Sequence, residues 1–494
     1  MKLCVENLNA LDDRVSRPIY DRSQVSVGIV HFGVGGFHRS HQAMYIDRLM
    51  NQGLALDWGI CGVGVMPADK AMRDALCGQD GLYTLVLRHG PGRIEAQVIG
   101  SIIDYLFAPD DPERVLEVLT GPNCRIVSLT ITEGGYNVDP VSGEFDVDNP
   151  AVRADLVPGA APSTVFGFVV EALRRRKEKG ILPFTVMSCD NVQSNGHVAR
   201  SSILAFAALR DPELADWIGR EVAFPNSMVD RITPTTTAED IAEVRAEFGI
   251  DDAWPVVCEP FTQWALEDNF VDGRPALDKA GAQLTSDVEP YERMKLRLLN
   301  ASHQAIAYSG HLSGYVYAHE AASDPVFVEF LLGYMNDEAR RTLGDVPGVD
   351  LDDYVLTLVA RFANPAIRDT LARLCAFSSD RIPKWVLPVL RENLAAGGEI
   401  TRTTAIVSSW ARYAEGVDEE GRPIDVQDAL RDEIMARAQA QTEDPLAFVR
   451  NGQLFGDLAD NAEFARRYEE CLRSFHAVGA RRTLQDINEA LRRA

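Results

Sequence analysis

Apolar runs alternate with helix-like segments in the first half of the chain. Short runs rich in β-branched side chains occupy residues 25–32, 58–65, 125–132 and 184–189. Helix-forming segments lie between them, at 43–52 and 163–179. Runs of this length predict buried strands, and their alternation with helices predicts an α/β fold with a parallel sheet. The polar, irregular residues 1–24 predict an arm, and the alternating pattern between 82 and 108 predicts an inserted hairpin.

The pattern changes near residue 287, beyond which strand signals fade. Ala, Leu, Arg and Glu, which favour helices, dominate the segments that follow. Helices are expected at residues 325–342, 351–376, 384–396, 400–415, 426–442, 444–454, 460–477 and 481–493. We therefore predict an α/β domain over residues 1–289 and a mostly α-helical domain over residues 290–494. The helix that begins at residue 290 lies at the junction of the two domains.

A glycine-rich turn follows the first apolar run. Residues 33–38 have the sequence GVGGFH, with histidine in the place of the usual third glycine. The order strand, glycine turn, helix, strand and acid is typical of a dinucleotide-binding unit. We therefore predict a Rossmann-like N-terminal domain that binds NAD, in which His38 and Arg39 supply positive donors near the pyrophosphate. The expected cofactor-binding residues are Phe32, Gly33, Val34, Gly35, Gly36, Phe37, His38, Arg39, Asp69 and Glu133.

Acidic and amide side chains stand where the predicted strands end. Asp69 closely follows the second strand, and Glu133 and Asn191 follow the next two. In open parallel sheets, ligands bind beyond the carboxyl ends of the strands. We expect Asp69 to accept hydrogen bonds from the adenosine ribose and to repel a 2′-phosphate, which favours NAD over NADP. Lys70 and Arg73 lie nearby and soften that repulsion.

Charge and cysteine usage restrict the class of protein. The net charge of −24 argues against nucleic acid, because no basic field exists to displace counterions from phosphates. The eight cysteines are scattered without a CxxC pair, so neither a disulfide framework nor a zinc knuckle is expected. The N-terminus lacks an apolar signal region, and no apolar run approaches transmembrane length. We expect a cytoplasmic monomer without a membrane partner.

One stretch combines an acid, an amine, an amide and an imidazole. On the helix predicted from residue 290, with 100° of turn per residue, an arc of roughly 140° contains Glu292, Lys295, Asn300 and His303. A solvated helix face could carry the same residues. A partly buried amine with a lowered pKa can nevertheless act as a general base near neutral pH, and amide groups can donate to a developing oxyanion. Lys295 with Asn191 and Asn300 meets these requirements for oxidising an alcohol.

Two other dehydrogenase chemistries fit parts of the pattern less well. Tyr291 and Lys295 form a YxxxK pair, as in short-chain dehydrogenases, but they open the second domain and lie too far from the glycine turn. His38 and His41 could bind a metal, as in zinc alcohol dehydrogenases, but no Cys or carboxylate cluster with ligand spacing accompanies them. We therefore expect no metal.

Six sequence blocks occur in a characteristic order along the chain. They are GVGGFHRSHQ (33–42), LTITEGGY (129–136), SCDN (188–191), FPNSMVDRITP (224–234), VCEPFTQW (257–264) and KLRLLNASH (295–303). In this combination they resemble the polyol-specific long-chain dehydrogenases, the mannitol dehydrogenase family, over essentially the whole chain. The resemblance implies a Rossmann-like N-terminal domain, a largely helical C-terminal domain and catalysis without a metal.

The resemblance also implies a role for each polar residue of the predicted helix. Lys295 is expected to be the general base, with Asn191 and Asn300 as the donors that stabilise the alkoxide. His303 is expected to position the substrate, and Glu292 to relay protons from Lys295 to solvent.

Further residues are expected to contact the substrate. They are Asp230, Arg373, Arg381 and Lys384. Arg381 stands where the mannitol enzymes carry a lysine. Asp230 could instead be the buried ion-pair partner of Arg231.

The substrate implied by the resemblance is D-mannitol, oxidised to D-fructose, with the reverse reduction. The same family contains D-arabinitol dehydrogenases and hexuronate reductases such as fructuronate reductase, and the shared blocks do not separate them. A nucleotide-binding regulatory protein that kept the fold without catalysis is a further alternative. The presence of Lys295, Asn191, Asn300 and His303 argues against it.

Overall fold

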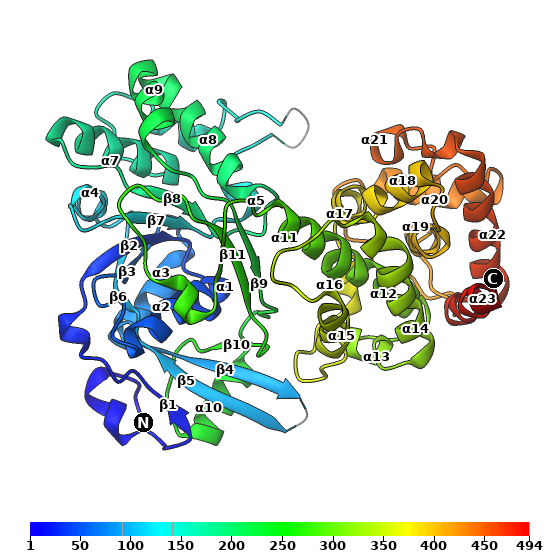
Figure 1. Ribbon diagram of the computed structural model, residues 1–494, viewed down its shortest axis with the longest axis horizontal. Helices are drawn as coiled ribbons and strands as arrows, with labels where there is room; N and C mark the ends of the chain where they lie inside the picture. The colour runs from blue at the N-terminus through cyan, green and yellow to red at the C-terminus, as the bar shows by residue number, and fades with distance from the viewer. Residues whose placement is uncertain (91, 140–142, 494) are drawn as a thin grey trace. The chain divides into compact units, whose positions relative to one another are not determined.

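The computed structural model describes residues 1–90, 92–139 and 143–493 (Figure 1). The chain divides into two compact units, Met1–Glu289 and Pro290–Ala494. Residue 91, within the expected hairpin, and residue 494, at the end of the expected helical domain, lie outside the described residues.

The first unit is built on a parallel sheet with the strand order β6-β3-β2-β7-β8. Its strands are β2 (Val27–Phe32), β3 (Gly59–Gly64), β6 (Ile102–Phe107), β7 (Ile126–Leu129) and β8 (Thr185–Ser188). The order confirms the predicted Rossmann-type fold, because winding starts at β2, runs outward through β3 to β6, and then resumes on the other side with β7. The carboxyl ends of β2 and β7 therefore form the switch point at which such sheets bind ligands.

Helices cover both faces of this sheet, because alternate residues of β2 point to opposite faces and pack against different helices. Val30 and Phe32 pack into one apolar cluster with α4, α7 and α8, whereas Ile29 packs into another with α2 and α3 (Figure 1). A strand buried on both faces needs such a continuous apolar run. The helices of this unit are α1 (Gly36–Ser40), α2 (Gln42–Asn51), α3 (Asp69–Cys77), α4 (Pro112–Thr120), α5 (Thr132–Gly135), α6 (Pro150–Asp155), α7 (Val165–Lys179), α8 (Asn195–Arg210), α9 (Pro212–Glu221) and α10 (Ala238–Phe248).

Two smaller sheets complete the first unit. One has the order β1-β5-β4-β10 and contains an antiparallel hairpin of β4 and β5; the other has the order β12-β11-β9. Their strands are β1 (Val15–Ser16), β4 (Tyr83–Gly90), β5 (Arg93–Ile99), β9 (Ser227–Asp230), β10 (Val256–Cys258), β11 (Gln263–Glu267) and β12 (Gln283–Thr285), and short 3-10 helices occupy Val5–Ala10 (η1), Arg22–Gln24 (η2) and Leu277–Ala280 (η3).

The sequence pattern misplaced two parts of this unit. Residues 102–107, which the alternating pattern assigned to the hairpin region, form β6 and pair with β3 in the parallel sheet. The predicted strand at 125–132 ends at Leu129, because Thr132 has a φ of +63° and begins the short helix α5.

The second unit is mostly helical, as predicted. Its long helix α19 is buried from Arg402 to Ala414 and packs against α12 and α22. The helices are α11 (Glu289–Met294), α12 (Ala301–Leu312), α13 (Ala318–Ala321), α14 (Pro325–Gly333), α15 (Leu351–Phe362), α16 (Leu371–Cys375), α17 (Ser378–Trp385), α18 (Leu387–Ala396), α19 (Thr401–Ala414), α20 (Arg431–Gln439), α21 (Gly452–Phe455), α22 (Ala462–Val478) and α23 (Ala480–Arg493). Two π-helices, η4 (Lys295–Asn300) and η5 (Tyr334–Ala339), and the 3-10 helices η6 (Arg340–Thr342), η7 (Ala440–Thr442) and η8 (Leu458–Asp460) stand among the described residues.

Candidate functional site

The turn after β2 has the backbone geometry that a dinucleotide pyrophosphate requires. Gly33 has a φ of +89°, and a Cβ there would lie 2.1 Å from the carbonyl oxygen of Thr130, so no larger residue fits. At Gly35 a Cβ would meet, among the described residues, the oxygen of Gly33 at 3.8 Å and nothing nearer, which leaves this backbone open to a ligand. Helix α1 begins at Gly36, directly after this open position. The turn therefore fits the dinucleotide predicted from the sequence.

A histidine beneath the turn holds it in this conformation. The hydroxyl of Thr130 donates to the carbonyl oxygen of Gly33 at 2.7 Å, so Thr130 Oγ1 must accept from Nε2–H of His31, 2.9 Å away. Nδ1 of His31 then accepts from the hydroxyl of Ser128 at 2.8 Å. Burial lowers the pKa of His31 to about 3, which keeps the ring neutral. The peptide of Gly33 is thus fixed by a chain of hydrogen bonds that starts on β7.

The predicted positive donors next to the turn are buried. The ring of His38 stacks on that of His31 at 3.4 Å, and burial lowers the pKa of His38 well below its ordinary value. The expectation of a positive charge on His38 is therefore wrong, because a buried imidazole stays neutral. Arg39 is also buried, and its guanidinium donates to the carbonyl oxygens of Gly35 and Trp254. Arg39 braces the turn from below, and a cofactor contact for either residue stays a prediction.

The other predicted cofactor residues lie around the same end of the sheet. Phe32 and Val34 are buried on either side of Gly33, and Phe37 is partly exposed at the first turn of α1. Asp69 starts α3, and its Oδ2 accepts from the backbone N–H of Met66 at 2.9 Å. Glu133 is exposed within α5.

A buried carboxylate that the sequence did not single out fixes the segment before Asn191. Asp190 accepts hydrogen bonds from the backbone N–H groups of Ile131, at 3.0 Å, and Thr132, at 2.7 Å. The hydroxyl of Tyr136 donates to the same carboxylate at 2.6 Å. The end of β8 is therefore tied to the turn after β7. The block SCDN contained this aspartate, but its role depends on contacts about 60 residues away in sequence.

The chain after Asn191 is held from the other side by Asn195. Its amide donates to the carbonyl oxygens of Asp190, at 2.9 Å, and Ser227, at 2.7 Å, and its oxygen accepts from the backbone N–H of Ser227 at 2.9 Å. Ser227 in turn donates through its hydroxyl to the carbonyl oxygen of Ser188 at 2.6 Å. Asn191 thus stands between two anchored residues, Asp190 and Asn195.

Asp230 ends β9 and is buried. The neighbouring Arg231 donates to the carbonyl oxygens of Glu259, at 3.0 Å, and Ser40, at 2.5 Å. These main-chain contacts use Nε and Nη1 of Arg231, and the alternative role of Asp230 as the ion-pair partner of Arg231 stays a prediction. A substrate contact of Asp230 stays a prediction.

In the second unit, the predicted catalytic helix is not a regular α-helix. Residues Lys295–Asn300 form a π-helix between α11 and α12. A π-helix turns by less than 100° per residue, because its hydrogen bonds span five residues instead of four, so the arc expected for a regular helix does not apply. Glu292, Lys295 and Asn300 are all buried, and the partly buried ring of His303 lies 4.5 Å from that of Phe362.

Tertiary contacts support the π-helix. The hydroxyl of Tyr334 donates to the carbonyl oxygen of Arg297 at 2.9 Å, within the irregular segment. The guanidinium of Arg297 bonds to both oxygens of Glu392, at 2.5 and 2.7 Å, and to the carbonyl oxygen of Thr342 at 2.8 Å. The π-helix that carries Lys295 and Asn300 is therefore clamped from two neighbouring segments. π-bulges are frequent at functional sites.

The three predicted substrate-binding cations sit on α16 and α17, which pack against α12 and η4. Arg373 forms a two-oxygen ion pair with Asp369, with N–O distances of 2.6 and 2.5 Å. Arg381 donates to the carbonyl oxygens of Arg373 and Leu374, at 3.2 and 3.0 Å. Nζ of Lys384 bonds to Asp380 at 2.5 Å. The structure thus brings Arg373 and Arg381 together and gives each cation a partner.

Residues 1–90, 92–139 and 143–493 contain no cluster of three or more His, Cys, Asp or Glu side chains that could hold a metal ion. Nor does any helix of this part of the chain have the length and apolar character needed to cross a membrane.

Known proteins are similar to this one over nearly the whole chain. Residues 27–279 match the model for the mannitol dehydrogenase Rossmann domain, and residues 287–476 match the model for the mannitol dehydrogenase C-terminal domain. The chain is 46% identical to a mannitol 2-dehydrogenase of Phaeosphaeria nodorum, over 98% of this chain and 85% of that protein. It is also 46% identical to a mannitol 2-dehydrogenase of Aspergillus fumigatus, over 95% of each protein.

Solved structures give the same result. The Pseudomonas fluorescens mannitol 2-dehydrogenase, in a ternary complex with NAD and D-mannitol, is 46% identical with a TM-score of 0.87, over 99% of this chain and all of that one. A D-sorbitol dehydrogenase in substrate-free form is 38% identical with a TM-score of 0.93, over 98% of this chain and all of that one. The chain belongs to the mannitol dehydrogenase family.

Proposed function

We propose that this protein oxidises D-mannitol at C2 to D-fructose with NAD, and catalyses the reverse reduction. The observation that carries the proposal is the 46% identity, over nearly the whole chain, to mannitol 2-dehydrogenases, one of which was solved with NAD and D-mannitol. The open glycine turn and the buried Lys295 and Asn300 supply the chemistry that this reaction needs.

In this proposal residues 1–289 bind NAD and residues 290–494 bind the polyol. NAD, when bound, accepts the hydride. Lys295 takes the proton from the hydroxyl group, and the amides of Asn191 and Asn300 donate to the alkoxide that develops. His303 holds a neighbouring hydroxyl, and Glu292 passes the proton from Lys295 to solvent.

We assign NAD rather than NADP as the preferred cofactor. The carboxylate of Asp69 would accept from ribose hydroxyls and repel a 2′-phosphate. Of the two nearby cations that could attract this phosphate, Lys70 and Arg73, Arg73 is already paired with Asp74, at 2.6 Å, and with Asp110, at 3.1 Å. A pairing of this kind reduces the attraction that Arg73 offers to a further anion.

The acidic partners of Arg373 and Lys384 favour a neutral polyol over a hexuronate. A substrate carboxylate is best held by a bidentate arginine. Both carboxylate oxygens of Asp369 already occupy Arg373, and Asp380 occupies Lys384. A hexuronate would have to compete with these acids, whereas a polyol hydroxyl can accept one N–H from a guanidinium that remains paired.

The decisive experiment is a substrate panel of mannitol, sorbitol, arabinitol, fructose, fructuronate and tagaturonate, ranked by kcat/KM with NAD(H) and NADP(H). We expect mannitol and fructose to rank first in their directions, with D-arabinitol as a secondary substrate. A tenfold preference for fructuronate over fructose, about 1.4 kcal/mol of transition-state discrimination, would make the arginines a carboxylate clamp and refute the mannitol assignment.

Sorbitol is the second candidate substrate, because the D-sorbitol dehydrogenase has a TM-score of 0.93 at 38% identity. It would replace mannitol in the proposal if its kcat/KM were the higher of the two. We also propose that the enzyme works as a monomer and without a metal. Gel filtration with light scattering tests the first statement, and full activity after dialysis against EDTA tests the second.

A further inference from the structure

Gly64 and Tyr105 lie next to Asp69 but have no role in the chemistry proposed above. Strand β6 pairs with β3 so that Tyr105 lies opposite Gly62, two residues before Gly64. A Cβ at Gly62 would lie 2.8 Å from Cδ2 of Tyr105 and 2.8 Å from Cγ2 of Val34 in the glycine turn. The tyrosine ring therefore occupies the space that a side chain on β3 would need, and it extends towards the cofactor turn.

Gly64 lies at the point where Tyr105 and Asp69 meet. A Cβ at Gly64 would lie 2.5 Å from Cβ of Asp69, 2.9 Å from the hydroxyl oxygen of Tyr105 and 3.3 Å from Cγ of Asp69. Contacts below 3.0 Å force a neighbour to move. Here one neighbour is the Cβ of the first residue of α3, which cannot move without shifting the start of that helix. Gly64 thus provides the space in which the side chain of Asp69 folds back over β3.

The hydroxyl of Tyr105 is buried and, among the described residues, has no hydrogen-bond partner. A buried hydroxyl without a partner is costly, and each one in a native protein calls for an explanation. Burial and the nearby carboxylate of Asp69 raise the pKa of Tyr105, so the hydroxyl keeps its proton and can donate. The hydroxyl oxygen of Tyr105 and Cγ of Asp69 both lie within 3.3 Å of the point that a Cβ on Gly64 would occupy, which makes the Asp69 carboxylate the candidate partner of this hydroxyl.

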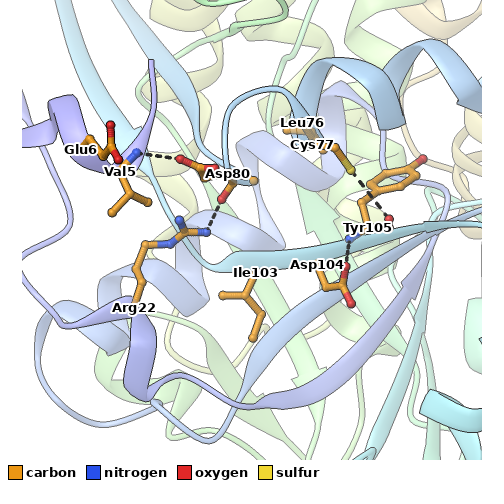
Figure 2. A pocket seen from close by; sticks show the side chains of 10 residues that line it. Val5, Glu6, Arg22, Leu76, Cys77, Asp80, Ile103, Asp104 and Tyr105 are labelled. Atoms are coloured by element: carbon orange, nitrogen blue, oxygen red, sulfur yellow. Dashed lines mark hydrogen bonds between the residues drawn. The ribbon is translucent and has the colours of Figure 1, made fainter. Parts of the chain in front are cut away.

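The last residue of α3 contacts Tyr105 directly. The thiol of Cys77, the last residue of α3, contacts the carbonyl oxygen of Tyr105 at 3.9 Å (Figure 2). On this side Tyr105, Cys77 and Asp104 border a cavity of about 580 Å³ that the N-terminal arm also lines (Figure 2). The first residue of α3, Asp69, therefore lies near the hydroxyl of Tyr105, and the last residue, Cys77, contacts its carbonyl oxygen.

We propose that Gly64 and Tyr105 form a specificity-determining pair that positions the Asp69 carboxylate against the adenosine ribose, with Tyr105 donating a hydrogen bond to Asp69 when the cofactor is bound. Tyr105 is a positioning residue in this inference, since it acts through Asp69. The inference rests on the proposed preference for NAD. It assigns that preference to three residues in place of Asp69 alone.

The experiment measures kcat/KM for NAD and for NADP, and the dissociation constant of each cofactor by fluorescence titration. In Tyr105→Phe, which keeps the ring, we expect NAD to bind about fivefold more weakly, as the loss of one hydrogen bond implies. NADP binding and the KM for mannitol should stay within twofold of wild type. Gly64→Ala should lower the ratio of NAD to NADP efficiency by tenfold or more, because it displaces Asp69 itself.

A double-mutant cycle identifies the route of the effect. If Tyr105 acts through Asp69, Tyr105→Phe should have no further effect on NAD binding in an Asp69→Ala background, which removes both acceptor oxygens. Tyr20→Phe, which removes another partly buried hydroxyl of the first unit, and Gly344→Ala, where no neighbour lies within 4 Å, are the matched controls and should leave cofactor selectivity unchanged. Unchanged NAD binding in Tyr105→Phe, or equal effects with and without Asp69, would overturn the inference.

Failure of this inference can be told apart from failure of the proposed function. If the wild-type enzyme prefers NADP, or if Asp69→Asn leaves the preference for NAD intact, the cofactor assignment itself is wrong. Should Gly64→Ala fail to fold, Tyr105→Phe and the cycle with Asp69→Ala still decide the inference.

Discussion

The carboxylate of Asp190 offers the sharpest test of how the first unit holds its site. Its Oδ1 accepts from the backbone N–H of Thr132, and its Oδ2 accepts both from the backbone N–H of Ile131 and from the hydroxyl of Tyr136. In Asp190→Asn one of the two oxygens becomes an NH₂ group. Whichever way the amide is turned, this NH₂ faces a backbone N–H, because each oxygen has one as its partner. The hydroxyl of Tyr136 can rotate to accept, but a backbone N–H cannot.

The size of the effect follows from this count. One partly buried backbone donor loses its acceptor, which costs about 1–3 kcal/mol. The donor lies on the turn after β7, and Asp190 itself precedes Asn191. A shift of about 1 Å at a catalytic group can lower a rate by roughly a hundredfold. We therefore expect Asp190→Asn to unfold about 1–3 kcal/mol more easily and to lose at least tenfold in kcat.

Urea unfolding followed by circular dichroism, together with steady-state kinetics, measures both effects. Asp216→Asn, a change at an exposed aspartate of the same unit, is the control and should match wild type in both assays. An Asp190→Asn enzyme with wild-type stability and full kcat would refute the reasoning, since it would mean that this network neither stabilises the sheet edge nor positions Asn191. A stability loss with unchanged kcat would confine the role of Asp190 to folding.

Further predictions concern the catalytic groups and pH. Lys295→Ala should lose at least a hundredfold in kcat/KM for mannitol, because general acid–base catalysis contributes about 10²–10⁴-fold, while the dissociation constant of NAD stays unchanged; activity above about a tenth of wild type would remove Lys295 from the role of base. Asn191→Ala and Asn300→Ala should each lower kcat in both directions by roughly a hundredfold, which corresponds to a loss near 3 kcal/mol of transition-state stabilisation. A near-normal kcat in both directions would mean that the substituted residue has only a structural role. Below pH 6.5 the unfolded chain protonates His31, whereas burial holds its pKa in the folded protein at about 3, so this residue's contribution to stability is full above pH 6.5 and declines as the pH falls. Between pH 7 and pH 5 wild type should lose about 2 kcal/mol more than His31→Asn, while the exposed-residue control His197→Asn should show the wild-type slope.

The sequence predicted those parts of the fold that depend on local patterns. The apolar runs that became β2, β3, β7 and β8 are short, β-branched and bounded by turn residues, so neighbouring residues suffice to identify them. Gly33 could be identified for the same reason, because a positive φ leaves a signature in the residue type itself. The place of Asp69 just beyond β3 also follows from order alone, because it is the first acidic residue after the second strand.

Features that depend on distant residues could not be predicted in this way. β6 has the alternating pattern of a hairpin strand, and its place beside β3 is a tertiary choice. His38 looked like a cation because its residue type can carry charge, whereas its neutrality results from stacking on His31 and from complete burial. Asp190 lies within the block SCDN and Tyr105 within none of the six blocks, and the role of each is recognised only by what it contacts after folding.

The π-helix shows where local propensity and tertiary structure disagree. Lys295–Asn300 has the sequence KLRLLN, which consists mostly of good helix formers and gives no sign of a break. A segment with i→i+5 hydrogen bonds is rare. Here the hydroxyl of Tyr334 donates to the carbonyl oxygen of Arg297, and Glu392 and Thr342 accept from the guanidinium of the same residue. Because a regular helix would need none of these contacts, the relative orientation of Lys295 and Asn300 is set by the packing of the second unit around Arg297. The geometry of the proposed base and oxyanion donor is therefore a property of the folded domain, and it cannot be calculated from their spacing in the sequence.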